Sequence, residues 1–119
     1  MKTLKCLFVA GLAVATSFAA RAEVSGQAWL ENYYRNPQPD ALPAAVQQLS
    51  RSGWFEQTGH TAVGIGFLST VFAKNPERVD RWLVELNGLP LAHHRLVAAA
   101  LWQAGHPLGR EMLQRLGDR

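Results

Sequence analysis

Cysteine is almost absent from this chain of 119 residues, because Cys6 is the only one. A disulfide within the chain needs two cysteines, so none is expected. The part of the chain beyond Cys6 also lacks a thiol for catalysis, redox exchange or zinc binding. A lipid anchor would require a cysteine at a signal-peptide cleavage point, where this chain has none. We therefore expect stability to come from the packing of a hydrophobic core.

Long hydrophobic runs are absent as well, and none reaches the roughly 20 residues that a membrane-spanning helix needs. The apolar run near the N-terminus extends from Leu7 to Ala15. It follows a basic start at Lys2 and Lys5 and precedes Ala-Arg-Ala at 20–22, which is the order of regions in a secretory signal peptide. The sequence therefore predicts a signal peptide over residues 1–22.

Cleavage is expected between Ala22 and Glu23, which leaves residues 23–119 as one exported helical domain. We expect this mature chain to be periplasmic, with secretion as the alternative, and not to insert stably into a membrane. An uncleaved anchor or a buried N-terminal helix is the other interpretation of residues 1–22.

An excess of one charge is also lacking once the leader is removed. The whole chain has 12 basic and 9 acidic residues, for a formal net charge of +3. Lys2, Lys5 and Arg21 belong to the leader, whereas every acidic residue lies beyond it, so the mature chain carries equal numbers of both signs. Its basic residues are scattered singly. This balance does not favour a nucleic-acid partner or an acidic membrane surface.

What the chain does contain is helical patterning. Pro, Gly and Asn punctuate it at intervals from Ser25 onward, and the apolar residues between them recur with helical spacing. This pattern predicts an all-α domain of about six short helices packed as helical hairpins. The expected helices cover residues 25–35, 40–52, 61–74, 75–86, 90–104 and 107–116.

Helix ends are marked by capping residues. Asp40 and Asn75 stand at positions where a side chain caps the first turn of a helix, and each is next to a proline. Gly53 and Gly105 follow the last turns of two other segments, as C-terminal glycines do. Residues 61–74 are apolar almost all round, which predicts a central, buried helix.

A weak internal repeat links two of these segments. Residues 39–49 match residues 76–86 at an offset of 37, so that Leu42 corresponds to Val79. A period of this size is typical of helix-turn-helix repeats of the tetratricopeptide class, in which each hairpin buries its face against the next. True repetition would give a short α-solenoid-like stack, and shared capping rules are the alternative origin of the match.

Short motifs spread along the mature chain carry a resemblance to a known group. They are Tyr33-Tyr34, Asn36-Pro37-Gln38-Pro39, Ser52-Gly53-Trp54-Phe55, Gly66-Phe67-Leu68, Phe72, Asn75-Pro76-Glu77-Arg78-Val79, Trp82-Leu83 and Ala100-Leu101-Trp102. The chain resembles small exported helical proteins of Proteobacteria whose role is uncharacterised. The resemblance implies a periplasmic location and a helical-hairpin fold, and it brings no catalytic residues.

Residues with catalytic or metal-binding chemistry lack the usual spacings. His93 and His94 are adjacent, so on a helix they point about 100° apart, and no pair of histidines shows the spacing of a helical zinc site. No serine lies in a nucleophile elbow. We therefore expect surface or capping histidines, no metal, no cofactor and no enzymatic activity. The alternative is a small enzyme in which at least two of His60, His93, His94, Glu77 and Asp80 converge in a cleft.

Aromatic residues give the candidate binding patch. Trp54 and Phe55 lie in a connection between helices, and Tyr33 and Tyr34 adjoin a proline-rich turn. Interfaces favour such side chains, so these four residues form the candidate interaction patch. Burial in the core is the alternative, because large aromatic side chains contribute most of the buried area in a small domain.

These features together predict an exported helical module that binds another protein. An adaptor or assembly factor of the cell envelope is the main hypothesis, because stacked hairpins present extended binding surfaces. A periplasmic inhibitor or immunity protein that blocks a toxic enzyme is the alternative, and it would have one tight partner.

Overall fold

The computed structural model of the protein describes residues 25–117, which form six α-helices, three short 3₁₀ turns and no strand. The elements are α2 (Gly26–Asn32), η1 (Pro39–Ala41), α3 (Leu42–Arg51), η2 (Trp54–Glu56), α4 (His60–Lys74), η3 (Pro76–Arg78), α5 (Val79–Glu85), α6 (Leu91–Gln103) and α7 (Pro107–Gly117). The predicted all-α fold with six helices is confirmed. The predicted signal peptide and its cleavage point at Ala22 and Glu23 lie outside the described residues.

Glycines end two of the helices as predicted. Gly53 follows α3 with φ 77°, and Gly105 follows α6 with φ 78°. Both values lie in the left-handed region, where a residue with a side chain is strained. At the start of α2, the Ser25 side chain accepts a hydrogen bond from the backbone N–H of Ala28 over 3.2 Å. Local sequence therefore determines these helix ends directly.

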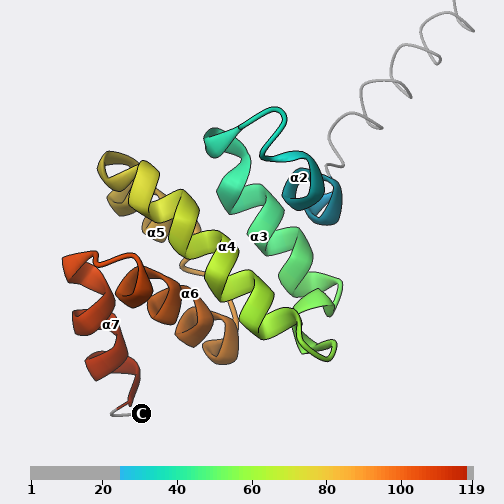
Figure 1. The fold of residues 1–119 in the computed structure, drawn as a ribbon. Helices are drawn as coiled ribbons and strands as arrows, with labels where there is room; N and C mark the ends of the chain where they lie inside the picture. The colour runs from blue at the N-terminus through green and yellow to red at the C-terminus, as the bar shows by residue number, and fades with distance from the viewer. Residues whose placement is uncertain (1–24, 118–119) are drawn as a thin grey trace, which may run out of the picture.

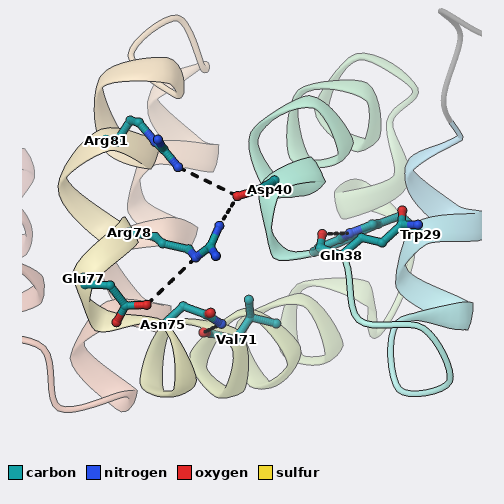
Figure 2. A network of polar contacts seen from close by, with 8 residues as sticks. All are labelled: Trp29, Gln38, Asp40, Val71, Asn75, Glu77, Arg78 and Arg81. Atoms are coloured by element: carbon teal, nitrogen blue, oxygen red, sulfur yellow. Dashed lines mark hydrogen bonds and ion pairs between the residues drawn. The ribbon is translucent and has the colours of Figure 1, made fainter.

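The predicted cap at Asp40 is wrong, because Asp40 lies inside η1 and its side chain caps no helix. Asn75 stands at the N-cap position of η3 before Pro76, as predicted, but its side chain makes no capping hydrogen bond. The 3₁₀ turns η1 and η3 come first, and their backbone carbonyls already accept from the first N–H groups of α3 and α5. The side chains are thereby released for other contacts. Asp40 forms an ion pair with Arg78, and the Asn75 amide donates to the carbonyl of Val71 over 2.9 Å, as Figure 2 shows.

Contacts at both ends hold α3 and α5 side by side. At one end the Asp40 carboxylate pairs with Arg78 and, over 3.8 Å, with Arg81 (Figure 2). Nearer the other end the Gln47 side chain donates to the backbone carbonyl of Glu85 over 2.7 Å. Polar contacts thus link two helices that are separated along the chain by the whole of α4.

The repeat at an offset of 37 has a structural counterpart. Turns η1 and η3 begin at Pro39 and Pro76, and each leads into an α-helix three residues later. The first residues of α3 and α5, Leu42 and Val79, are both 0% exposed. The helices that precede the turns differ, because α2 has 7 residues and α4 has 15. The correspondence is therefore confined to the turn and the helix after it.

Helices that are not consecutive along the chain pack on one another. Helix α4 contacts α6, α3 contacts α5, and α2 reaches α4 through the rings of Trp29 and Phe67, whose centroids are 5.3 Å apart. Figure 1 shows α2 and α3 at one side of the molecule and α7 at the opposite edge. The six helices thus form one compact all-α globule.

The hydrophobic core lies at the centre of these packed helices. Its largest fully buried side chains are Leu42, Val46, Val71, Phe72, Val79, Trp82, Leu86, Val97 and Leu101. Helix α4 is central, as predicted, but its first turns are not buried all round, since Ala62 is exposed and Val63 is 52% exposed. No helix in residues 25–117 combines the length and the apolar character that crossing a membrane would require.

Two close backbone approaches set the helix spacing. At Gly109 in α7, an added Cβ would lie 2.4 Å from the backbone nitrogen of Trp102 in α6. At Gly26 in α2, it would lie 2.5 Å from the carbonyl oxygen of Ala45 in α3. These two glycines therefore let α7 pack on α6 and α2 pack on α3 at short range.

Candidate functional site

The four residues of the predicted interaction patch do not form one surface. Trp54 and Phe55 are 7% and 3% exposed and belong to the core, where η2 packs against α3 and α4. Tyr33 is half-buried, and its ring lies edge-on to Trp29 and Phe67. Only Tyr34, 75% exposed, lies on the surface, where its hydroxyl accepts a hydrogen bond from Arg35 over 3.1 Å. The core alternative is therefore correct for Trp54 and Phe55.

The physical reason lies in the turn before η2. Gly53 reverses the chain with its positive φ, so that the segment 54–56 folds back between α3 and α4 and is not displayed as an open loop. Gly64 in α4 makes room for it, because a Cβ there would lie 3.0 Å from the Phe55 ring.

An apolar hollow elsewhere in the structure is a better candidate for binding. It has a volume of about 430 Å³ and lies between α5, the connection after it, α6 and α7. We call it the α5–α7 groove, and its lining residues are Leu83, Leu86, Asn87, Leu89, Leu91, His94, Val97, Met112, Arg115 and Leu116. Seven of these ten side chains are apolar, which is the usual composition of a binding site.

Helical spacing explains how the sequence builds the groove. Leu91, His94 and Val97 occupy one face of α6 at intervals of three, and Met112 and Leu116 lie one turn apart on α7. Leu91 is 41% exposed, so part of the lining faces solvent. The groove is thus an opening in the core between α5, α6 and α7.

The groove carries positive charge at its edge. Arg115 is its only residue with a fixed charge, and its guanidinium lies 4.0 Å from Glu111 in an exposed pair one helical turn apart. Such pairs contribute little and exchange readily with other partners. His94 adds an imidazole, whose Nε2 lies 3.2 Å from the carbonyl oxygen of Asn87.

A second feature is a buried histidine that joins three elements. His93 on α6 is 6% exposed, with its Nδ1 2.5 Å from the Ser50 hydroxyl on α3 and its Nε2 2.6 Å from the Glu56 carboxylate on η2. The expectation of surface or capping histidines is wrong for this residue. One signal was available, since 93, 96, 97 and 100 share the apolar face of α6.

The hydrogen-bonding roles in this cluster follow from the chemistry of its end groups. A carboxylate only accepts, so the Nε2–H of His93 donates to Glu56. Nδ1 of the neutral ring then accepts from the hydroxyl of Ser50. In residues 25–117, no buried side-chain nitrogen or oxygen lacks a partner.

Serine, histidine and carboxylate are also the residue types of serine hydrolases, but their placement here is different. Ser50 lies within α3 and lines neither the α5–α7 groove nor the pocket beside Glu56. The nearby N–H groups of Ser52 and Gly53 donate to backbone carbonyls, so neither is free to stabilise an oxyanion. The exposed end of the cluster is Glu56, whose side chain is 61% exposed.

The other histidines have separate roles. His60 stacks on Trp54 with ring centroids 4.1 Å apart and bonds to its carbonyl oxygen, and Nδ1 of His106 accepts from the N–H of Leu108 in the first turn of α7. Glu77 lies beside Arg78. Residues 25–117 contain no cluster of three or more His, Cys, Asp and Glu side chains that could hold a metal ion.

Searches of protein-family models, of curated proteins and of solved structures each found no significant match to this chain. The resemblance to small exported helical proteins therefore stays a prediction, and the candidate sites depend on the geometry alone.

Proposed function

We propose that the protein is an exported binding module of the cell envelope, and that it holds a segment of another protein in the α5–α7 groove. The observation that carries this proposal is the groove itself, where three helices leave an apolar hollow of about 430 Å³ with Leu91 partly open to solvent. When a partner side chain covers an open apolar site of this kind, apolar surface leaves water and the free energy of the complex falls.

The positive charge at the edge of the groove indicates which kind of partner segment binds there. Arg115 has only a weak, exposed pair with Glu111, and no acidic side chain lines the groove. The occupant is therefore an amphipathic segment that places apolar side chains against Leu86, Leu91 and Met112 and an acidic side chain beside Arg115. Charge complementarity of this kind selects the partner and fixes its register.

Capture from envelope extracts with matched variants tests the proposal. Leu91→Glu places a charge in the groove, whereas Val63→Glu places the same charge at a similarly exposed apolar position on α4 that does not line it. We expect the wild type and Val63→Glu to capture the same protein and Leu91→Glu to lose it. Equal capture by both variants, or capture of nothing specific by the wild type, contradicts the proposal.

The captured protein also distinguishes an adaptor from an inhibitor. An inhibitor or immunity protein would hold one enzyme tightly and abolish its activity, and an adaptor would leave its partners active. Export has its own test, because the N-terminal sequence of the exported protein is expected to begin at Glu23. Any other start contradicts the predicted cleavage point.

A further inference from the structure

A second pocket lies on the other side of α6 from the α5–α7 groove and uses different residues. It has a volume of about 460 Å³ and is formed by η2, α4 and α6. We call it the Glu56 pocket; the residues that matter here are Phe55, Glu56, Ile65, His93, Arg95 and Leu96. Most of its surface is apolar, and one carboxylate opens onto it.

That carboxylate is held in a fixed position from behind. His93 donates to one oxygen of Glu56 over 2.6 Å, and the imidazole is held in turn by Ser50 over 2.5 Å. His93 is 6% exposed, so the surrounding core restricts its ring. A carboxylate has lone pairs for about four hydrogen bonds, and this arrangement leaves the second oxygen free.

No basic side chain in the described part of the chain donates a hydrogen bond to the second carboxylate oxygen of Glu56. Within residues 25–117 no lysine or arginine forms an ion pair with this carboxylate, and its side-chain contact is the hydrogen bond from His93. Arg95 lines the same pocket, but its guanidinium donates to the carbonyl of Leu116 in the last turn of α7 over 3.4 Å. The pocket therefore presents an oriented anion next to the apolar side chains of Phe55, Ile65 and Leu96.

We propose that the Glu56 pocket binds a primary alkylammonium group, with the ammonium on Glu56 and the alkyl chain against the apolar lining. An ammonium offers three donors to the free carboxylate oxygen, and charge-assisted hydrogen bonds are stronger than neutral ones. Transfer of the methylene chain from water to the apolar lining is also favourable. A lysine side chain of a partner and a free aliphatic amine share this chemistry.

The test uses n-butylammonium chloride as the probe, with backbone amide NMR shifts of the exported protein as the readout. n-Butanol and sodium pentanoate have the same butyl chain without the positive charge. We expect saturable shifts of residues 55–56 and 92–96 with n-butylammonium only. Equal shifts with n-butanol, or no saturable shift with the amine, overturn the proposal.

Two matched variants locate the charge. Glu56→Gln keeps a carbonyl oxygen for the Nε2–H of His93 and removes only the charge, and Glu111→Gln does the same at a carboxylate with the same 61% exposure. Glu56→Gln should weaken n-butylammonium binding about fivefold, as expected for a partly exposed ion pair, and Glu111→Gln should leave it unchanged. Equal effects of both variants overturn the assignment to Glu56.

A further pair of measurements does not depend on the folding of Glu56→Gln. Raising the salt concentration should weaken n-butylammonium binding to the wild type, because the contact is ionic. Arg95→Gln should strengthen it, since a like charge leaves the pocket lining. No salt dependence, or weaker binding by Arg95→Gln, contradicts the proposal. Comparing the affinities of α-N-acetyl-lysine amide and 1,5-diaminopentane distinguishes the two sources. Tighter binding of the lysine amide identifies a lysine side chain of a partner, and tighter binding of the diamine identifies a free amine.

Discussion

The hydrogen bond between Ser50 and His93 allows the sharpest stability prediction. Ser50→Ala removes the hydroxyl that donates to Nδ1 over 2.5 Å, and because His93 is 6% exposed, water does not readily replace it. A buried polar group left without its partner costs about 1–3 kcal/mol. Alanine returns about 0.5 kcal/mol through its better helix propensity. We therefore expect a net loss of about 0.5–2.5 kcal/mol in the free energy of unfolding.

Urea unfolding followed by circular dichroism measures this loss, with Ser52→Ala as the control. The hydroxyl of Ser52 also donates a hydrogen bond, to Leu49 over 3.1 Å, but the residue is exposed, so its removal should change stability by less than about 0.5 kcal/mol. A double-mutant cycle with His93→Phe isolates the pair, because Ser50→Ala should cost little once the imidazole is gone. Wild-type stability in Ser50→Ala, or an unchanged cost in the cycle, would refute the reasoning.

Four further variants test the packing and the Asp40 ion pairs, each measured by the same unfolding assay. Gly109→Ala should destabilise by at least about 2 kcal/mol, because its Cβ would meet the backbone of Trp102, while Gly66→Ala, with no atom within 4 Å, should stabilise by about 0.5–1 kcal/mol; the same sign for both refutes the close approach. Leu42→Ala removes a side chain that is 0% exposed and should cost about 2–5 kcal/mol. Asp40→Asn breaks the exposed ion pairs to α5 and should cost less than about 1 kcal/mol, and a larger loss would show a stronger link between the hairpins.

Helix number and most helix ends were predictable because they depend on local physics. Gly53 and Gly105 end helices at the positions that the sequence predicts, since a positive φ is a property of one residue and its neighbours. The cap predicted at Asp40 is wrong, and Asn75 stands at a cap position without a capping bond, because a 3₁₀ turn satisfies the same N–H groups through the backbone. Residue type alone does not distinguish these two solutions.

The candidate sites were less predictable because they depend on tertiary contacts. Helical spacing places His93 on the apolar face of α6, but its partners are 43 and 37 residues away in sequence. The sequence allows Trp54 and Phe55 to lie either in a binding patch or in the core, because they follow a glycine in a connection, and the turn that buries them is visible only in three dimensions. The α5–α7 groove likewise joins side chains from three helices.

Site-specific photo-crosslinking is the most direct test of the α5–α7 groove as the binding surface. A photoreactive phenylalanine analogue replaces Leu91, and a matched protein carries it at Val63, which is also exposed but lies on α4. The account predicts a discrete adduct from position 91 in intact envelopes, with the crosslinked partner segment containing apolar residues and an acidic one. Adducts from position 63 alone, or none from position 91, would contradict it.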